Sequence, residues 1–433
     1  MGVKVLVVGS GGREHAICWR VLRDRPDAKV YCAPGNGGIG TIATLVPIGA
    51  SAIEDLVQWA KIQQPDLVIV GPEEPSALGL VDQLLAQGIR AFGPSAAAAQ
   101  LEASKAWTSS LLERAGIPIP RTAIFAQAED AHNYVDSRDH LLVVKADGLA
   151  LGKGVLVCRS VAEAHSAVDL LLVERKFGDA GVPIVIQDRC FGPELSVFAL
   201  CAGTDFRLLG SARDYKRAYD GNAGPNTGGM GAYTPVTDAR PQLIQEIADQ
   251  IIGPTLEATA RAGAPFTGIL YAGIMLTTDG PVVIEFNVRL GDPEAQVILT
   301  TSSGDFVSAI ELAIDGKLEK VDVSPDGSAA VCIVLTSNGY PNHYEKGHEI
   351  NGLDDLPNGG LAFHAGTETR SGSVYTVGGR VLSVVGHSEN IRSARRLAYQ
   401  AARQITFKGV HMRTDVALSE ISTPPDANGE RLK

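Results

Sequence analysis

From the start of the chain to about residue 94, short runs of β-branched and other apolar residues alternate with stretches in which apolar residues recur at helical spacing. This alternation predicts repeated βαβ units and therefore a parallel sheet. The turns that leave the expected strands contain glycine and proline. Ligands of open α/β sheets bind at the carboxyl ends of strands, so we expect this domain to bind a small molecule. The expected strands are 3–8, 29–32, 67–70 and 90–92, and the expected helices are 14–22, 53–62 and 77–85.

After about residue 104 the pattern changes to mixed α+β, and the segment 322–328, which contains Pro, Gly and Ser, is expected to be a linker. The predicted fold class is α/β multidomain. We expect an N-terminal Rossmann-like domain with a parallel sheet at 1–103, a central α+β domain at 104–326 with a lid subdomain at about 122–195, a small β-rich α+β domain at 327–425, and a tail at 426–433. Further expected elements are strands at 141–145, 155–158, 183–188, 195–202, 206–211, 269–276, 282–287, 329–335, 374–377 and 380–385, and a helix near 393–405.

Composition narrows the classes of function. Hydrophobic residues make up 45% and charged residues 20% of the 433 residues, as in ordinary globular proteins. A formal net charge of -11 argues against general binding to nucleic acid or anionic membranes, because both need a basic surface. No apolar run approaches the roughly 18 residues of a membrane span, so we expect a cytoplasmic protein. The six cysteines are scattered, which indicates neither a zinc site nor a disulfide framework.

A glycine-bearing hairpin at 143–155 is the first candidate site. Its glycines let the backbone approach a polyphosphate closely, while Lys145 and Lys153 supply positive charge. The hairpin lacks the Walker A pattern, so a nucleotide would be clasped between sheets. The alternative is a mobile hairpin with surface lysines. Because Lys145 closes an apolar strand, where a cation needs an anionic partner, we favour the binding site.

The second candidate is the segment 281–294. Residues two apart in a strand share a face, so Glu285 and Asn287 point the same way, and Arg289 follows on their side if the strand persists. Mg²⁺ takes such oxygen ligands and commonly bridges a carboxylate to nucleotide phosphates. Arg289 would stabilise charge on a transferring phosphoryl group. The alternative is an edge strand whose polar residues are solvated.

Two further segments are candidates for binding. The stretch 211–233 is long, polar and rich in glycine, which is uncommon in a compact domain unless the loop binds a ligand; otherwise it is disordered. The turn 9–15 has glutamate where a dinucleotide fingerprint wants glycine, so NAD binding is not indicated. A strand, a glycine turn and a helix N-terminus still form a phosphate cradle, with Arg13 beside it. A tight structural turn is the alternative.

Taken together, these segments resemble the glycinamide ribonucleotide synthetase family of the ATP-grasp superfamily along nearly the whole chain. The segments 224–233 and 285–294 are specific to the family rather than to the superfamily. The resemblance is carried by GSGGREHA at 9–16, APGN at 33–36, IVGPE at 69–73, KADGLA at 145–150, GPNTGGMGAY at 224–233 and EFNVRLGDPE at 285–294.

The resemblance implies an ATP-grasp fold for the central domain and an enzyme that uses ATP and Mg²⁺ or Mn²⁺ to join glycine to 5-phosphoribosylamine through a glycyl phosphate, in the second step of purine biosynthesis. The implied catalytic residues are Arg289, Lys145 and Lys216, and the implied metal ligands are Glu285 and Asn287. ATP would contact Lys105, Lys145, Gly148, Gly152, Lys153, Gly154, Gln187, Cys190 and Glu194. The other substrates would contact Gly11, Gly12, Arg13, Asn36, Gly37, Glu73, Asp214, Lys216, Asn226, Thr227, Arg289 and Asp292.

The chain departs from the family's pattern at the expected nucleotide site. Gln187 and Pro193 stand where acidic residues are common, which leaves Glu194 as the candidate ribose ligand. The strand at 268–276 supplies no carboxylate, so the number of metal ions stays open. Because a glycyl phosphate and an aminosugar are labile, we expect the lid to close over them and exclude water.

Two other functions are compatible with parts of the sequence. Another ATP-grasp ligase or carboxylase with an acyl phosphate intermediate is the nearer one, and the segment 224–233 argues against it. A nucleotide-binding module without catalysis is the more remote one, and it would not need Glu285, Asn287 and Arg289 together. The expected partners are small-molecule substrates, with no nucleic acid and no membrane, and we expect a monomer.

Overall fold

The computed structural model describes residues 2–150 and 154–422. Its N-terminal part is the predicted parallel sheet, in the order β3-β2-β1-β4-β5. Helix α1 packs on one face of this sheet, against Val5 and Val7, while α2 and α4 pack on the other, against Leu6 and Val8. The strands are β1 (Lys4–Gly9), β2 (Lys29–Pro34), β3 (Thr44–Leu45), β4 (Leu67–Val70) and β5 (Ala91–Phe92), and the helices are α1 (Gly12–Asp24), α2 (Ile53–Gln63), α3 (Glu73–Ala77) and α4 (Leu80–Ala86).

The helix predicted at 77–85 is wrong in its extent, because two helices occupy the segment. Helix α3 starts directly at Glu73, and α4 starts after Gly79, whose φ of 82° breaks the helical path. Only glycine adopts this backbone conformation at little cost. The break matters for the site because it places Glu73 in the first turn of a separate helix at the carboxyl end of β4.

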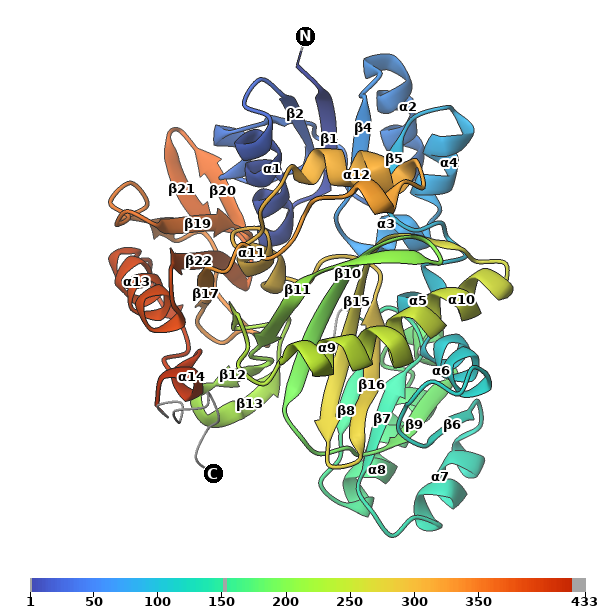
Figure 1. Ribbon diagram of the computed structural model, residues 1–433. Helices are drawn as coiled ribbons and strands as arrows, with labels where there is room; N and C mark the ends of the chain where they lie inside the picture. The colour runs from blue at the N-terminus through green and yellow to red at the C-terminus, as the bar shows by residue number, and fades with distance from the viewer. Residues whose placement is uncertain (1, 151–153, 423–433) are drawn as a thin grey trace.

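The middle of the molecule is a nine-stranded, largely antiparallel sheet to which both the central and the C-terminal parts of the chain contribute (Figure 1). Its path is β16-β15-β10-β11-β14-β17-β22-β19, and β23 pairs with β17. The junction is the antiparallel pairing of β14 with β17, so the C-terminal strands continue the central sheet. The strands are β10 (Glu194–Gly203), β11 (Asp205–Asp214), β14 (Gly231–Thr234), β15 (Phe266–Thr277), β16 (Gly280–Asn287), β17 (Ala329–Ser337), β19 (Gly360–His364), β22 (Arg380–Ser388) and β23 (Val410–His411).

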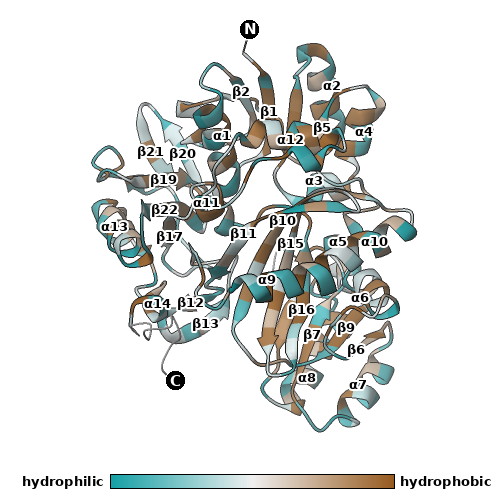
Figure 2. Ribbon diagram, in the orientation of Figure 1, coloured by the Kyte–Doolittle hydropathy of each residue, from teal (hydrophilic) through white to brown (hydrophobic). Residues whose placement is uncertain are grey.

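Alternation along these strands builds a separate core on each face of the nine-stranded sheet. Val197 and Leu270 face the core that contains α10 and α13, whereas their neighbours Phe198 and Ile269 face the core that contains α1, α11 and α12. Strands β10 and β15 are accordingly largely brown in Figure 2, and the outer faces of α9 and α13 are teal. The helices are α5 (Gln100–Ala103), α6 (Lys105–Arg114), α9 (Pro241–Ile247), α10 (Gly253–Arg261), α11 (Glu294–Ile298), α12 (Phe306–Ile314), α13 (Ile391–Gln404) and α14 (Leu418–Ser422).

The stretch 211–233 was predicted to be a long loop, and the structure corrects this. Strand β11 runs on to Asp214, and a short hairpin of β12 (Arg217–Tyr219) and β13 (Ala223–Asn226) follows before β14. The side chain of Arg413, far along the chain, donates to the carbonyl of Arg217 and so fixes this hairpin. Such an anchor has no local sequence signal.

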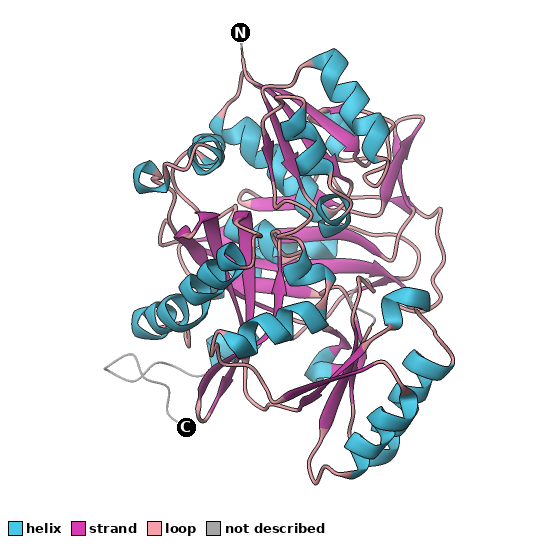
Figure 3. Cartoon of the chain, turned by 90° about the vertical axis from the view of Figure 1, so that its right-hand side faces the viewer, coloured by secondary structure: helices cyan, strands magenta, loops and turns pink. Residues whose placement is uncertain are grey.

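A smaller four-stranded sheet in the order β6-β9-β7-β8 lies at the bottom of Figure 1, with α7 and α8 beside it. Its apolar side chains, among them Val144 and Ile186, form a cluster of their own. Figure 3 shows it as a separate layer below the large sheet. The strands are β6 (Thr122–Phe125), β7 (Leu142–Ala146), β8 (Val155–Val157) and β9 (Ile184–Asp188), and the helices are α7 (Ala128–Asp136) and α8 (Val161–Val168).

The remaining sheet, in the order β18-β21-β20, belongs to the C-terminal part of the chain. Helix α13, predicted near 393–405, is confirmed; its N-cap Asn390 accepts a hydrogen bond from the Ser393 amide. Within residues 2–150 and 154–422, no helix has both the length and the apolar character to cross a membrane. The strands of this sheet are β18 (Glu349–Ile350), β20 (Thr367–Arg370) and β21 (Ser373–Thr376).

Candidate active site

A cavity of about 1150 Å³ lies between the nine-stranded (large) sheet and the four-stranded (small) sheet, and it extends to the turns of the N-terminal domain. Its walls come from parts of the chain that are far apart in sequence. The small sheet supplies β7 and β9, the large sheet supplies β10, β11, β15 and β16, the N-terminal domain supplies the turns after β1 and β4, and the C-terminal part supplies Tyr340, Pro341 and Arg380. Most of the predicted site residues meet here.

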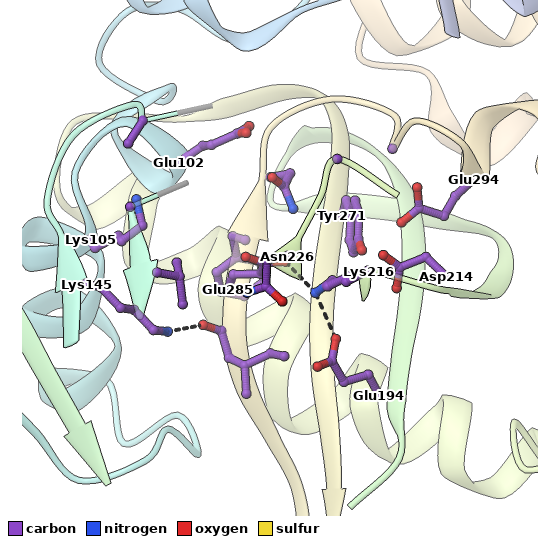
Figure 4. A pocket seen from close by; sticks show the side chains of 18 of the residues that line it. Glu102, Lys105, Lys145, Glu194, Asp214, Lys216, Asn226, Tyr271, Glu285 and Glu294 are labelled. Atoms are coloured by element: carbon purple, nitrogen blue, oxygen red, sulfur yellow. Dashed lines mark hydrogen bonds and ion pairs between the residues drawn. The ribbon is translucent and has the colours of Figure 1, made fainter. Parts of the chain in front are cut away.

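In the cavity wall, the ammonium group of Lys216 lies between two carboxylates (Figure 4). The Lys216 Nζ lies 2.8 Å from a Glu194 oxygen and 3.0 Å from a Glu285 oxygen. The Lys216 ammonium, helped by the other nearby lysines and opposed by burial, lowers the pKa of Glu285 to about 2. Burial acts to lower the pKa of Lys216, but Glu194 and Glu285 outweigh it and the pKa is raised. Both Lys216 and Glu285 are therefore charged at neutral pH.

Two more lysines approach Glu285 from the side of the small sheet (Figure 4). The Lys145 Nζ, at the end of β7, donates to the Ile284 carbonyl at 2.8 Å. Burial lowers the pKa of Lys145 to about 8, although Glu285 opposes this. The Lys105 Nζ, at the start of α6, donates to the carbonyls of Asp147 and Gly148 at 3.3 Å. The end of β7 in the hairpin 143–155 therefore lies next to Glu285, so the first two candidate segments meet in the structure.

The hairpin and α6 are joined by a capping contact. The Asp147 carboxylate accepts hydrogen bonds from the Ala106 amide at 2.7 Å and from the Ser104 hydroxyl at 3.0 Å. Ser104 is itself the N-cap of α6 and accepts from the Trp107 amide. An acidic residue at a helix N-terminus satisfies free amides there. This cap is what brings Lys105 next to Lys145.

The side chains of Glu285 and Asn287 both line the cavity, while Phe286 between them is buried in the core. Among the described residues, no group of three or more His, Cys, Asp or Glu side chains is arranged to hold a metal ion. One carboxylate and one amide still fit Mg²⁺, because that ion keeps several waters and is completed by substrate phosphates. The Lys216 ammonium lies against both the Glu285 and the Glu194 carboxylates, so these two groups present negative charge to a cation.

Arg289 is clamped between two carboxylates. Its Nε lies 3.0 Å from a Glu73 oxygen and its Nη2 lies 2.8 Å from a Glu102 oxygen. Burial acts to raise the pKa of Glu73, but Arg289 and Arg13 lower it to about 2. Burial raises the pKa of Glu102 to about 7 against the effect of Arg289. Sequence reasoning missed Glu102; its only local signal is its position three residues before Lys105.

The turn after β1 is held by contacts among its own residues and with the segment that follows β16. The Arg13 guanidinium pairs with Glu14 at 2.6 Å and donates to the Leu290 carbonyl at 3.0 Å. Glu14 also accepts from the Gly11 amide at 2.6 Å. The Gly12 position has no room for a side chain, since a Cβ there would lie 2.6 Å from a Gln296 nitrogen. Gly11 and Arg13 line the cavity, and Gly12 does not.

The second turn serves the domain interface rather than the cavity. The Asn36 amide nitrogen donates to the Ser10 and His364 carbonyls at 2.8 and 2.7 Å, and its oxygen accepts from the Gly38 and Ile39 amides. The Gly37 amide donates to the Thr367 carbonyl. These contacts use the polar atoms of the Asn36 side chain internally. Neither Asn36 nor Gly37 lines the cavity.

The wall opposite the lysines is acidic. Burial raises the pKa of Asp214 despite Lys216, and burial likewise raises the pKa of Glu294. Both side chains and Tyr271 lie on this side of Lys216 in Figure 4. Asp292 behaves differently: burial acts to raise its pKa, but Arg380 and Arg13 lower it. Glu294 and Tyr271 were not singled out in the sequence.

The predicted site residues fall into three groups. Gly12, Asn36, Gly37 and Gly148 do not line the cavity, and the Gly148 amide donates to the Ala180 carbonyl at 2.8 Å. Gly152 and Lys153 lie outside the described residues. The predicted residues that line the cavity are Gly11, Arg13, Glu73, Lys105, Lys145, Gly154, Gln187, Cys190, Glu194, Asp214, Lys216, Asn226, Thr227, Glu285, Asn287, Arg289 and Asp292.

Comparison with known proteins gives the family of the chain. The chain matches the phosphoribosylglycinamide synthetase N domain at residues 3–102, the ATP-grasp (A) domain at 103–295 and the C domain at 330–419. The phosphoribosylamine–glycine ligase of Rhodopirellula baltica is 44% identical over 98% of this chain and 99% of its own length. That of Ralstonia nicotianae is 43% identical over 96% of this chain and 98% of its own.

Solved structures give the same picture. A phosphoribosylamine–glycine ligase from Thermotoga maritima superposes with a TM-score of 0.83 at 36% identity, covering 96% of this chain and all of that one. A biotin carboxylase from Campylobacter jejuni has a TM-score of 0.73 at 15% identity, covering all of this chain and 97% of its own, and shares the fold alone. The predicted resemblance and fold class are confirmed. The chain belongs to the phosphoribosylglycinamide synthetase family.

Proposed function

We propose that the cavity between the two sheets is the active site of an ATP-dependent ligase that joins glycine to phosphoribosylamine. Family membership and the names of the curated relatives support this reaction. We place the active site here because the Glu285 carboxylate is ionised and is faced by Lys216 on one side and by Lys145 on the other. A triphosphate and its cation need this combination of a fixed carboxylate and convergent positive charge.

The ATP phosphates are proposed to lie between Glu285 and the lysines. Lys145 and Lys105 would contact the phosphates, and Gln187, Cys190 and Glu194 would face the nucleoside. Glu285 and Asn287 would hold Mg²⁺ or Mn²⁺, which supplies charge neutralisation for the phosphate oxygens. We also propose that the domains meet at 103/104 and at 326/327, that the protein is a monomer, and that it is located in the cytoplasm.

In the first step, a carboxylate oxygen of glycine attacks the γ-phosphorus and the bond to the ADP oxygen breaks, giving glycyl phosphate. Arg289 and Lys145 are proposed to stabilise the charge on the transferring group. In the second step, the amine of phosphoribosylamine attacks the acyl carbon, phosphate leaves, and the nitrogen loses a proton. Asp214, Lys216 and Asp292 are proposed to orient these substrates.

Closure of the small sheet is proposed to keep water from the glycyl phosphate. The sheet has its own apolar cluster, and Lys145 with Ile284 and Asp147 with Ser104 and Ala106 are polar contacts that join it to the rest of the molecule, so it can move as a unit when such contacts exchange. A fluorescent probe on Lys153 is expected to respond when nucleotide is added. An unchanged signal would remove closure from the mechanism.

The test of the function is ADP formation by the purified protein with ATP and a divalent cation. We expect turnover to require glycine and phosphoribosylamine together and to be weak when either is omitted. Bicarbonate in place of glycine is the informative control, because ATP-grasp carboxylases use it. Phosphate release with bicarbonate and none with the two predicted substrates would replace the proposal with a carboxylase function.

A further inference from the structure

Two side chains from the C-terminal part of the chain reach the cavity wall, and nothing in the sequence pattern singled them out. Tyr340 follows β17, and Arg380 begins β22. Both line the cavity, although they are more than a hundred residues from the segment 226–229 that they contact. Sheet continuity through β14 and β17 is what brings them there.

Both polar backbone atoms of Gly228 are hydrogen-bonded to side chains from the C-terminal part of the chain. Its amide donates to the Tyr340 hydroxyl at 3.1 Å, and its carbonyl accepts from the Arg380 guanidinium. A Cβ at position 228 would lie 3.0 Å from the Arg380 Cζ, so a larger residue there would push the guanidinium aside. Every polar atom of the Gly228 backbone is therefore fixed by the C-terminal part of the chain.

The same guanidinium fixes a second piece of the wall. Arg380 donates to the Asp292 carbonyl through Nη1 and to the Asp292 carboxylate through Nη2 at 3.0 Å. The planar fork of arginine presents several donors in one fixed geometry, which an ammonium lacks. One side chain thus ties the segment 226–229 to the segment that follows β16.

The contacts continue from Gly228 to the centre of the site. The Gly229 amide donates to the Thr227 hydroxyl at 3.0 Å, and that hydroxyl donates to the Lys216 carbonyl at 3.0 Å. The Lys216 ammonium in turn contacts Glu285. The segment 226–229 is therefore hydrogen-bonded to the backbone of Lys216, the residue that pairs with Glu285.

We propose that Tyr340 and Arg380 are positioning residues that hold the segment 226–229 and Asp292 in the geometry needed for phosphoribosylamine. The inference rests on the proposed function for its choice of substrate. Arg380 contacts Asp292, whereas Lys145 contacts the Ile284 carbonyl beside Glu285, so we expect loss of Tyr340 or Arg380 to weaken binding of the sugar substrate more than binding of ATP. On this view the C-terminal part of the chain belongs to the catalytic unit.

Tyr340→Phe is the sharpest test, because it removes one hydroxyl and keeps the ring. We expect the KM for phosphoribosylamine to rise about fivefold, as for the loss of one neutral hydrogen bond, with the KM for ATP and kcat within about twofold. Tyr344→Phe is the matched control. The Tyr344 ring lies 6.1 Å from that of Tyr340, and its hydroxyl makes no hydrogen bond to a described residue.

Arg380→Met should have the larger effect, a fall of about a hundredfold in kcat/KM for phosphoribosylamine, because it leaves the buried Asp292 carboxylate without its cation. Arg380→Lys should recover little, since an ammonium cannot reach both the Gly228 carbonyl and Asp292. Equal KM values for phosphoribosylamine in the Tyr340→Phe and Tyr344→Phe proteins, or a KM for ATP that rises in parallel, would overturn the inference.

Hydrogen exchange of the peptide spanning 226–229 provides a readout that does not depend on activity. We expect exchange there to be at least about fivefold faster in Tyr340→Phe and unchanged in Tyr344→Phe. If the parent protein turned over no phosphoribosylamine while exchange still accelerated, the proposed function would fail and the positioning of the segment would stand. Unchanged exchange in Tyr340→Phe would overturn the positioning itself.

Discussion

The large and the small sheet form opposite walls of the cavity, and they are attached to the rest of the molecule in different ways. The large sheet is tied to its neighbours by buried polar side chains such as Asn36 and Arg380, each of which bonds to a distant segment. The small sheet carries its own apolar cluster and reaches the large one through Lys145. The difference indicates a fixed wall that holds the carboxylates together with Lys216, and a more independent wall that brings Lys145.

The largest expected effect comes from the fixed wall. Glu285→Ala removes the carboxylate that faces three lysines, so we expect ADP formation to fall by about a thousandfold or more while nucleotide binding weakens far less. Steady-state kinetics and calorimetric titration with ATP check this. Asp279→Ala, in the turn of the same hairpin, is the control and should behave as the parent. Equal rates in Glu285→Ala and parent protein would refute the assignment of this carboxylate.

Next in size is the contact between helix α1 and the segment that follows α11, beside the large sheet. Arg20 is 1% exposed, pairs with Asp24 at 2.7 Å and donates to the Leu299 and Ser302 carbonyls at 2.8 and 2.7 Å. Arg20→Met should lower the free energy of unfolding by about 3 to 5 kcal/mol, because it leaves a buried carboxylate without its partner. Urea unfolding measures this. The exposed Arg207→Met should change stability by less than about 0.5 kcal/mol, and a similar loss in both variants would contradict the prediction.

The contact between the two walls should be sensitive to pH. The pKa of Lys145 is lowered by burial to about 8, so its ammonium is present below that pH and is lost above it. We expect kcat/KM for ATP to be level below pH 8 and to fall above it, because this ratio reports ionisation of the free enzyme. Lys145→Arg should remove the fall up to about pH 10. Lys176→Met, in the same small unit, should keep the parent profile.

The smallest effect is expected at the interface between the N-terminal and C-terminal parts. Burial lowers the pKa of His15 to about 3, and its Nδ1 accepts from the His364 amide at 2.8 Å. The unfolded chain binds a proton near pH 6.5 and the folded chain does not, so stability is full above pH 6.5 and falls as pH drops towards 3. His15→Gln should reduce the steepness of this fall by about 1.4 kcal/mol per pH unit between pH 5.5 and 4.5. Thermal or urea unfolding at each pH measures it, and an unchanged slope would count against a neutral His15.

The sequence predicted the elements with strong local patterns. The parallel sheet of the N-terminal domain and helix α13 follow from apolar periodicity and capping, which depend on neighbours along the chain. The alternation at Glu285 and Asn287 correctly places both side chains in the cavity. The hairpin within 211–233 was missed because its strands are fixed by Arg413, a partner almost two hundred residues away.

The site residues show the same difference between local sequence signals and contacts made only on folding. Lys145 and Glu285 were identifiable because a charged residue at the end of an apolar strand needs a reason to be there. Glu102, Tyr340 and Arg380 carry no such mark, and their positions beside Arg289 and Gly228 come from chain segments that meet only after folding. Conversely, Asn36 has the composition of a binding turn, yet its side-chain atoms are used by the domain interface.

By itself the sequence determined most of the strands and helices, many of the residues that bear the chemistry and the family to which the chain belongs, because propensity, alternation and motif spacing are local properties. Only the tertiary structure decided that the C-terminal strands extend the central sheet, that Lys216 rests between Glu194 and Glu285, and that Arg380 closes the wall of the cavity. These features depend on burial and on contacts between distant segments, where each charge is stable only beside the partner that folding supplies.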